Sequence, residues 1–295
     1  MERLACDRFK TTCIIEGQDF TTKVFIDKQN KRVKLIECKG NKEKAVNELI
    51  EFSSKQGMGK IITVMKENEA TEFLTKEFVA EGKIEGYFKG EDGFCISYFI
   101  DKDRSKSKRI IEEEEILKKA FEHSGDFVYT DNEAYRIRTA TEDDAESITE
   151  IFNKVFTSYP TPMDNPEYVK DIMKQNVLFK IAEKSGKIIS VASADMDTAK
   201  LNAEMTDCAT LPEYRGKGLL GDLIFQLEEE LREKRYITLF SLSRALSTGI
   251  NIVFSKHGYV YSGRQINNCD IMGKFEDMNL WVKKLIYPIR RGVTK

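Results

Sequence analysis

The fold is decided by one stretch of the sequence, Thr206-Asp207-Cys208-Ala209-Thr210-Leu211-Pro212-Glu213-Tyr214-Arg215-Gly216-Lys217-Gly218-Leu219-Leu220-Gly221. A β-type run enters a glycine-rich turn, and an amphipathic helix follows from Leu219. Glycine lets a ligand approach the backbone closely, and the N–H groups at a helix start carry about half a positive charge. The stretch therefore predicts a strand–turn–helix unit that binds a pyrophosphate.

Two other nucleotide-binding motifs resemble this loop but fit it less well. Gly216, Gly218 and Gly221 match the dinucleotide pattern Gly-x-Gly-x-x-Gly. That motif needs glycines directly after the first strand of its domain and an acidic residue about 20 positions later. Here residues 212–215 intervene, and the next expected strand, 236–242, contains no acid. No Gly-Lys-Ser/Thr of an NTPase occurs. An ordinary glycine turn at a helix start remains the structural alternative.

The composition favours a globular protein that binds neither nucleic acid nor membrane. The 295 residues are 41% hydrophobic and 33% charged, and 47 basic against 49 acidic residues give a formal charge of −2. This balance provides no field that would gather nucleic acid or an anionic membrane. No apolar run approaches the roughly 20 residues of a membrane span, and residues 1–7 do not resemble a secretory signal.

The cysteines indicate a reducing compartment. All six are scattered without a Cys-x-x-Cys pair, and His123 and His257 are the only histidines. A structural zinc site is therefore not expected, and we expect reduced thiols in cores and strands. These features are typical of a cytoplasmic protein.

The chain divides into two units at a charged segment. We expect an α/β domain without a recognisable site over residues 1–105 and a charged helical linker over 106–133. A second domain is expected over 134–276, followed by a tail or helix over 277–295. The second unit should begin with a strand at Tyr135–Arg138 and a helix N-cap formed by Thr141 and Asp144. Its expected element order, β-α-α-β-β-β-α-β-α-β-β, predicts a mixed α/β sheet with helices on both faces.

Residues 212–218 resemble the acyl-CoA pyrophosphate loop of the Gcn5-related N-acetyltransferase (GNAT) superfamily, whose pattern is Gln/Arg-x-x-Gly-x-Gly/Ala. Glu213 departs from the pattern at its first position. The element order of residues 134–276 also agrees with the family. The resemblance implies acetyl-CoA as cosubstrate, no metal, and a cofactor site formed by Cys208, Ala209, Thr210, Arg215, Gly216, Lys217, Gly218, Leu219 and Leu220, with Asn251 on the pantetheine arm.

A closer likeness is to the β-lysine N-acetyltransferases, and it extends over nearly the whole chain. It rests on residues 135–140, 156–160, 203–210 and 255–259. This likeness implies a small-molecule amine acceptor, β-lysine, acetylated on its side-chain nitrogen. In this fold Tyr159 and Asp164 lie in the loop that shapes the acceptor pocket, and Arg244 is a candidate receptor for the acceptor's carboxylate.

Acetyl transfer needs a neutral amine, and a lysine-type ammonium has a pKa of about 10.4, so deprotonation at pH 7 costs roughly 4.6 kcal/mol. Glu204 and Asp207 lie on the strand where family members often place a carboxylate base. A regular strand would point them to opposite faces, but a bulge common in the family would change that. We favour Glu204 as base and Asp207 as partner of the substrate ammonium, with surface acids as the alternative.

The family stabilises the oxyanion with a backbone N–H, here near Cys208 or Ala209. A covalent route through the Cys208 thiol has no histidine partner nearby in sequence. The family's general acid is a tyrosine that falls on Phe254, which cannot donate a proton. Tyr261, Ser247 and a water molecule remain open for this role.

The N-terminal half is a candidate for a second, degenerate copy of the fold, because its later elements parallel those of the second unit without a glycine loop. We expect a monomer or a homodimer. Two other functions remain open, a non-catalytic acyl-CoA sensor or complex subunit and a protein or peptide N-acetyltransferase. Retention of Glu204 and Asp207 argues against the sensor.

Overall fold

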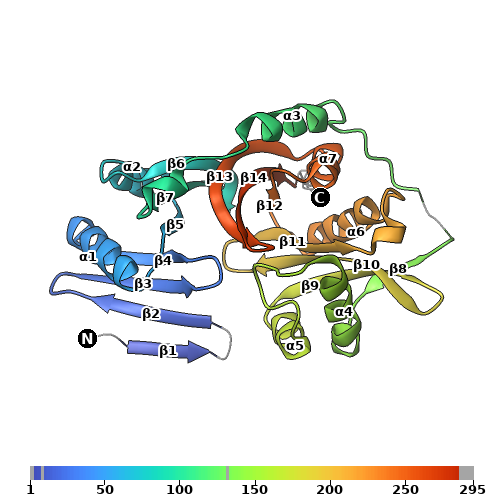
Figure 1. Cartoon of the computed structure of the whole chain (residues 1–295), viewed down its shortest axis with the longest axis horizontal. Coiled ribbons are helices and arrows are strands. Elements are labelled where there is room, and N and C mark those ends of the chain that lie inside the picture. The colour runs from blue at the N-terminus through green and yellow to red at the C-terminus, as the bar shows by residue number, and fades with distance from the viewer. Residues whose placement is uncertain (1–2, 8–9, 131–132, 286–295) are drawn as a thin grey trace, which may run out of the picture.

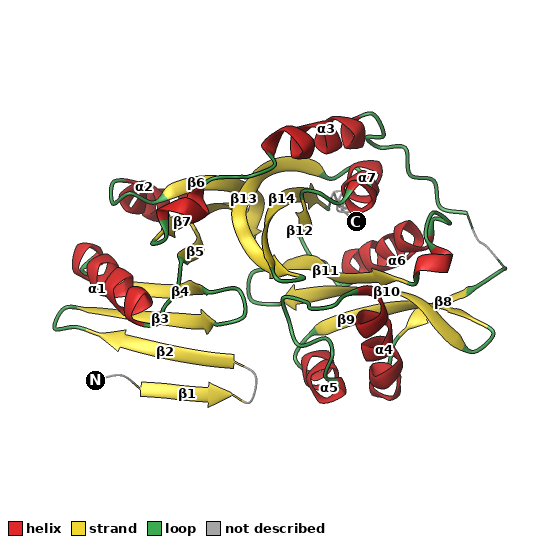
Figure 2. Ribbon diagram, in the orientation of Figure 1, coloured by secondary structure: helices red, strands yellow, loops and turns green. Residues whose placement is uncertain are grey.

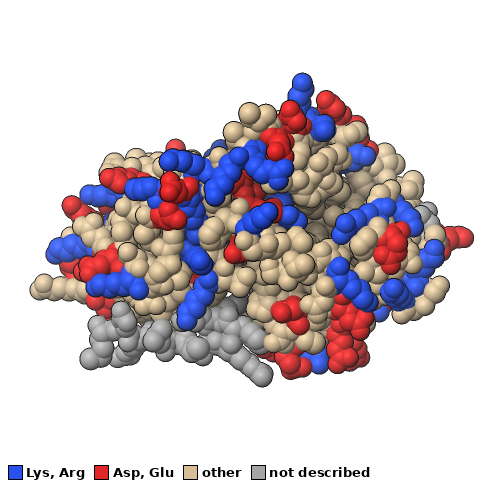
Figure 3. Space-filling view, viewed as in Figure 1, with Lys and Arg blue, Asp and Glu red and all other residues tan. Residues whose placement is uncertain are grey.

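The computed structural model describes residues 3–7, 10–130 and 133–285 and shows two α/β halves side by side (Figure 1). One mixed sheet of 14 strands runs through both, in the order β1-β2-β3-β4-β5-β7-β6-β13-β14-β12-β11-β10-β9-β8. The mixed α/β fold predicted from the sequence is confirmed. On the face shown in Figure 3, acidic and basic side chains are interspersed.

The N-terminal half is an antiparallel meander followed by two helices and three further strands. Its elements are β1 (Arg3–Asp7), β2 (Lys10–Glu16), β3 (Phe20–Asp27), β4 (Arg32–Gly40), α1 (Lys42–Lys55), β5 (Lys60–Met65), α2 (Glu67–Leu74), β6 (Val79–Phe88) and β7 (Glu91–Phe99). Asn41 caps α1 directly after β4, its side chain accepting a hydrogen bond from Lys44 N. The apolar stripe of α1 packs on β3 and β4 and forms the core of this half.

The C-terminal half has helices on both faces of its strands. After the 3₁₀ turn Lys102–Ser105 and helix α3 (Ile110–Phe121), its elements are β8 (Arg136–Thr139), α4 (Ala145–Val155), α5 (Pro166–Lys174), β9 (Val177–Lys184), β10 (Lys187–Asp197), β11 (Asn202–Thr210), α6 (Leu219–Glu233), β12 (Thr238–Arg244), α7 (Thr248–Lys256), β13 (Val260–Ile271) and β14 (Lys274–Lys284). Helices α4 and α5 cover one face and α6 the other (Figure 2). The predicted Thr141–Asp144 cap is a capping box.

Both halves have the same strand order. The N-terminal half runs β1-β2-β3-β4-β5-β7-β6 and the C-terminal half β8-β9-β10-β11-β12-β14-β13. In each, the fourth and fifth strands pair in parallel and the last two strands form an antiparallel pair. Only residues 8 and 9 separate β1 from β2, so this half has no counterpart of α4 and α5. The N-terminal half thus repeats the sheet without its first two helices.

The two sheets join where Gly82 of β6 pairs with Gly263 of β13. A Cβ on Gly263 would lie 2.2 Å from the carbonyl oxygen of Glu81 and 2.5 Å from Cα of Gly82. The backbones therefore approach more closely than any side chain would permit, and glycine is required here. An apolar cluster from β6, β7, β12 and β14 packs beside this contact, formed by Ile84, Tyr87, Cys95, Phe240, Leu280 and Val282.

A buried ion pair holds β13 against the N-terminal half. Lys60 Nζ lies 2.8 Å from the Glu81 carboxylate and donates a hydrogen bond to the Ile266 carbonyl at 2.8 Å. Glu81 accepts a hydrogen bond from Ile266 N at 2.7 Å. Ile266 lies where the β13–β14 register is interrupted between Gln265 and Cys269, so side chains of the other half satisfy its backbone. Burial lowers the pKa of Lys60 to about 8, although Glu81 favours its charged form.

The helix expected in the linker is present as α3, but the tail or helix expected from residue 277 is wrong for residues 277–284. These residues continue β14 and pair with β12. Leu280, Trp281 and Val282 are buried on both faces of the sheet, so they lack the alternation that marks a half-buried strand. Residues 286–295 of that prediction lie outside the described residues.

We predict that Gly263→Ala will weaken the join between the halves. Its methyl group would overlap the β6 backbone, and we expect a loss of about 2–3 kcal/mol or more in the free energy of unfolding. Urea denaturation measures this loss. Gly273→Ala is the matched control, because Gly273 also has a positive φ, 75°, but nothing lies within 4 Å of its added Cβ. Equal losses in the two variants would contradict the role of the close approach.

Candidate active site

Strands β11 and β12 separate in the middle of the C-terminal half. They pair in parallel only through Asn202–Thr238, Ala203–Leu239 and Glu204–Phe240, although β11 continues to Thr210 and β12 to Arg244. Beyond Glu204, β11 therefore has no strand partner on its β12 side within the described residues. Backbone groups at such an edge are available to an extended ligand.

Strand β11 is bulged at Asp207, as the family resemblance implied. Ser193 of β10 pairs with Thr206, whereas Val191 pairs with Ala209, so the register shifts between them. Asp207 has a positive φ of 42°, and its Oδ2 accepts a hydrogen bond from Ser193 Oγ at 3.2 Å. The bulge interrupts the alternation of side chains along the strand.

The bulge brings Asp207 to the face that carries Glu204. Glu204 pairs directly with Asp195 across β10 and β11, and Asp195 shares its face of β10 with Ser193, two residues away. Because Ser193 is bonded to Asp207, three carboxylates lie on one face. The opposite-face orientation of a regular strand does not occur.

The surroundings of Glu204 and Asp207 raise the pKa values of these two carboxylates toward neutral pH. Burial raises the pKa of Glu204 to about 7; Lys34 opposes this effect, and the charges of Asp195 and Asp207 add to it. Burial also raises the pKa of Asp207 to about 6, although hydrogen bonds with Ser193 and Tyr159 favour its charged form. A carboxyl group with a pKa near 7 exchanges protons readily at neutral pH, as a general base must.

The loop between α4 and α5 lies over Asp207. Thr161 Oγ1 is 3.5 Å from Asp207 Oδ1, and the Tyr159 ring packs 4.9 Å from Phe152, centroid to centroid. Burial and the charge of Asp207 raise the pKa of Tyr159 well above its usual value, so its hydroxyl is a hydrogen-bond donor. Asp164, by contrast, is exposed, and in the part of the chain that the structure describes it makes no hydrogen bond or ion pair.

The Cys208 side chain is a poor nucleophile in this environment. Its Sγ donates a hydrogen bond to the Thr206 carbonyl at 3.3 Å. Burial, with the charge of Asp207, raises the pKa of the thiol far above its usual range. The thiol is therefore protonated at neutral pH, and the geometry leaves only the backbone of Cys208 available for chemistry.

The glycine loop forms an open start to α6. Gly216 and Gly218 have positive φ of 74° and 81°, and nothing lies within 4 Å of an added Cβ at either position. Over the described residues, the backbone N–H groups from Gly216 to Gly221 donate no hydrogen bond to a backbone carbonyl outside α6. Arg215 and Lys217 are exposed beside them. Consecutive free donors and two cations at a helix start suit a pyrophosphate.

Asn251 and Arg244, which were expected to contact coenzyme A and the acceptor, are bonded to other side chains and carbonyls of the protein instead. Asn251 Oδ1 accepts hydrogen bonds from Ser243, Asn279 and Trp281, and its Nδ2 donates to two backbone carbonyls. Its amide therefore has no donor or acceptor left for a pantetheine arm. Arg244 forms a two-point ion pair with Glu276 at 2.7 and 2.6 Å, which occupies the guanidinium expected to receive a carboxylate.

The residue at the usual position of the general acid is apolar and buried. The Phe254 ring lies 5.0 Å from that of Tyr259, centroid to centroid. Tyr261, one alternative, packs between the rings of Phe121 and Trp281. The structure assigns none of these side chains to the leaving group.

Sequence reasoning missed several polar residues at this site. Ser193 and Asp195 lie two residues apart on one face of β10, whose residues 188–194 are otherwise apolar except for Ser190, and that pattern could have identified them. Arg32 and Lys34 of β4 act on the charge of Glu204. No local pattern connects these two residues with β11, because they belong to the other half of the chain.

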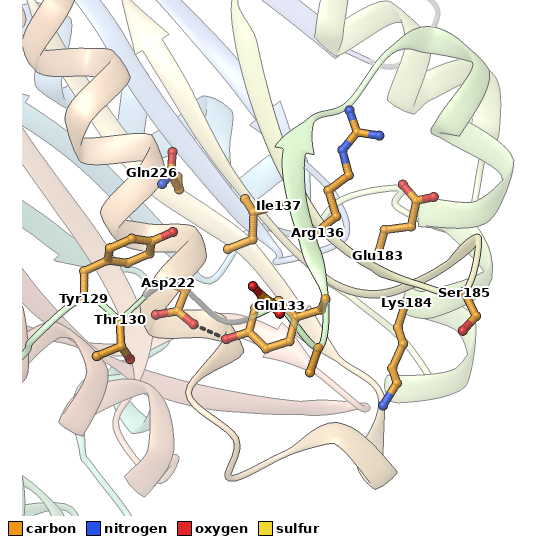
Figure 4. Close-up of a pocket in the computed structure, with 12 residues that line it drawn as sticks. Tyr129, Thr130, Glu133, Arg136, Ile137, Glu183, Lys184, Ser185, Asp222 and Gln226 are labelled. Atoms are coloured by element: carbon orange, nitrogen blue, oxygen red, sulfur yellow. Dashed lines mark hydrogen bonds between the residues drawn. The ribbon is translucent and has the colours of Figure 1, made fainter.

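A pocket outside this site lies beside the first turn of α6 (Figure 4). It has a volume of about 630 Å³, and Tyr135 donates a hydrogen bond to Asp222 at its wall. None of the three carboxylates lines it. Among the described residues, no cluster of His, Cys, Asp or Glu could hold a metal ion, and no helix has the length and apolar character needed to cross a membrane.

Comparison with known proteins connects this geometry with one family. The family model described as an acetyltransferase (GNAT) domain matches residues 136–245. The chain is 33% identical over 270 residues to the beta-lysine N(6)-acetyltransferase of Methanococcus maripaludis, covering 92% of this chain and 95% of that protein. It is 35% identical over 267 residues to the protein of the same name from Methanosarcina mazei, covering 83% and 98%. The N-acetyltransferase YodP of Bacillus subtilis is 32% identical over 271 residues, covering 92% and 98%.

We predict that Gly218→Ala will weaken binding of coenzyme A about tenfold. Alanine is strained at a φ of 81°, and its methyl group would stand among the N–H donors, so we expect a cost of about 1–2 kcal/mol in binding. Isothermal titration calorimetry measures the affinity. Gly186→Ala is the control, because Gly186 has a φ of 74° and equal space in a hairpin turn. A loss of affinity in both variants alike would contradict the assignment of the loop.

Proposed function

Because this chain belongs to the GNAT N-acetyltransferase family, we propose that it transfers the acetyl group of acetyl-CoA to the side-chain (N6) amine of β-lysine and gives Nε-acetyl-β-lysine. The observation that carries the acceptor is the similarity, along most of both chains, to two proteins named beta-lysine N(6)-acetyltransferase. The cluster of Asp195, Glu204 and Asp207 agrees with it, because β-lysine has two ammonium groups for carboxylates to bind.

The chain offers two sites that fit the cosubstrate. The open N–H groups from Gly216 to Gly221, with Arg215 and Lys217, would hold the pyrophosphate. The edge of β11 beyond Glu204 would hold the pantetheine arm by backbone hydrogen bonds. When bound, acetyl-CoA supplies the thioester carbonyl that the amine attacks.

Glu204 is the proposed general base. Within the described residues its carboxylate makes no hydrogen bond or ion pair, whereas Asp207 is held by Ser193 and Thr161. Glu204 is therefore free to take a proton from the acceptor ammonium, and its pKa of about 7 suits that transfer. Asp207, fixed in place, is the proposed partner of an ammonium group.

The bulge in β11 supports the expected oxyanion donor. A tetrahedral intermediate needs a backbone N–H that is not already bonded in the sheet. We expect such an N–H near Cys208 or Ala209, because the register of β11 shifts around Asp207 and its pairing with β12 ends at Glu204. The protonated Cys208 thiol favours direct attack by the amine over an acetyl-cysteine intermediate.

Other acceptors remain alternatives. The name of YodP states no acceptor, so that relative does not distinguish β-lysine from another amine, a protein N-terminus or a lysine side chain. A non-catalytic sensor is not favoured, because the family and the relatives are acetyltransferases. The cytoplasmic location and the monomeric or homodimeric state stay predictions from the sequence.

We predict that β-lysine is acetylated with a higher kcat/KM than α-lysine, polyamines or a lysine-containing peptide. The expected product carries the acetyl group on the side-chain nitrogen. A thiol-release assay with acetyl-CoA measures the rates, and mass spectrometry with NMR identifies the acetylated nitrogen. A higher kcat/KM for α-lysine or for the peptide would overturn the acceptor.

We predict that Glu204→Gln will lower kcat about 10²–10⁴-fold at pH 7, because the ammonium loses its base. In the wild type kcat/KM should rise with pH and bend near pH 7, since Glu204, with a pKa of about 7, must be deprotonated to act. The bend should be absent in the variant. Glu48→Gln, a charge loss at an exposed position of α1, is the control. A bend retained in Glu204→Gln would place the base elsewhere.

A further inference from the structure

Strand β4 presents two cations on the face of its sheet away from α1. Val33 and Leu35 are buried in the core of the N-terminal half, while Arg32 and Lys34 alternate with them on the other face. That face lacks covering helices, because this half has no counterpart of α4 and α5. In Figure 3, Lys and Arg side chains lie along the seam where the two halves meet.

The turn between β3 and β4 contacts the loop over the active site. Asn30 Nδ2 donates a hydrogen bond to the Pro160 carbonyl at 3.3 Å, next to Tyr159 and Thr161. Asn30 Oδ1 accepts from Asp270 N at 2.8 Å, and the Asn30 carbonyl accepts from Arg104 at 2.8 Å. This turn is therefore fixed between the α4–α5 loop and β13.

Arg32 is held at the same place. Its Nε lies 2.8 Å from Asp27 Oδ2, and one terminal nitrogen donates to the Asn268 carbonyl at 3.0 Å. The same nitrogen is 3.5 Å from Cys269 Sγ. Asp27 and β13 thus orient the guanidinium at the seam, where it forms a fixed positive charge.

Lys34 is the unengaged member of the pair. Over the described residues its exposed ammonium makes no hydrogen bond or ion pair. It nevertheless lies near enough to Glu204 to favour the charged carboxylate, and Arg32 acts in the same direction more weakly. An unpaired ammonium opposite a group of carboxylates is suited to bind a second negative charge.

We propose that the acceptor binds in the seam between the two halves, where Lys34 of β4 receives its carboxylate beside the fixed charge of Arg32, while Asp195, Glu204 and Asp207 receive its ammonium groups. This inference rests on the proposed function, since it needs an acceptor with a carboxylate. A diamino acid has two positive groups and one negative group, and the two strands supply the opposite charges. The N-terminal half is then a substrate-binding element. It binds the carboxylate that was expected to bind Arg244, whose guanidinium is paired with Glu276.

The test compares β-lysine with 1,4-diaminopentane, which has the same two amines on the same carbon chain without the carboxylate. Lys34→Met should lower kcat/KM for β-lysine about 10–100-fold, mainly through KM, because a hydrogen bond to a charged group is lost. At about pH 9, where Glu204, with a pKa of about 7, is deprotonated with or without Lys34, the kcat/KM for the diamine should stay within about threefold, since that acceptor makes no contact with Lys34. Lys34→Arg should retain the preference for β-lysine.

Lys23→Met is the matched control, because Lys23 of β3 is exposed on the same face of the sheet as Lys34 but is not among the charges that shift the pKa of Glu204 or Asp207. It should leave both substrates unchanged. Equal losses for both substrates in Lys34→Met, or no loss for either, would overturn the inference. A wild type that does not prefer β-lysine to the diamine would also overturn it, whereas a wild type that acetylates neither of them would refute the proposed acceptor itself, and both outcomes are seen before any variant is made.

Discussion

The close approach of Gly82 and Gly263 determines how the two halves of this protein are placed. An edge strand normally ends a sheet, yet here two edges pair because neither strand has a side chain at the crossing point. Lys60 and Glu81 then satisfy the backbone of Ile266 where β13 is irregular. The same irregular segment reaches Cys269 beside Arg32. The geometry of the seam therefore depends on a contact far from the carboxylates.

The candidate site concentrates charge at a cost in stability. Burial raises the pKa values of Glu204 and Asp207, which means that their charged forms are less stable in the folded protein than in water. The positive charges of Lys34 and Arg32 offset part of this cost from across the seam. Functional sites commonly combine a shifted pKa with an incomplete set of partners, because the missing partner is the ligand. The unbonded carboxylate of Glu204 and ammonium of Lys34 fit that pattern.

The two halves show how one strand order serves two purposes. In each half, the fourth and fifth strands pair in parallel through three residue pairs, Arg32–Lys60 to Lys34–Ile62 and Asn202–Thr238 to Glu204–Phe240. In the C-terminal half a glycine loop follows the fourth strand. In the N-terminal half Asn41 caps the next helix directly, so no open loop is left for a phosphate. Lys34 and Glu204 hold the same place in the two repeats, with opposite charge.

The sequence by itself determined the glycine loop, the order of the elements and the capping box at Thr141, because each depends on residues close together in the chain. It also identified Glu204 and Asp207 as candidates, but their common face depends on a bulge opposite Ser193. Only the tertiary structure decided that Arg244 forms an ion pair with Glu276 and that the Asn251 amide is bonded within the protein. It also decided that the cations of β4 act on the carboxylate of Glu204. Those contacts join segments that are distant in sequence, and no local periodicity encodes which strand edges will meet.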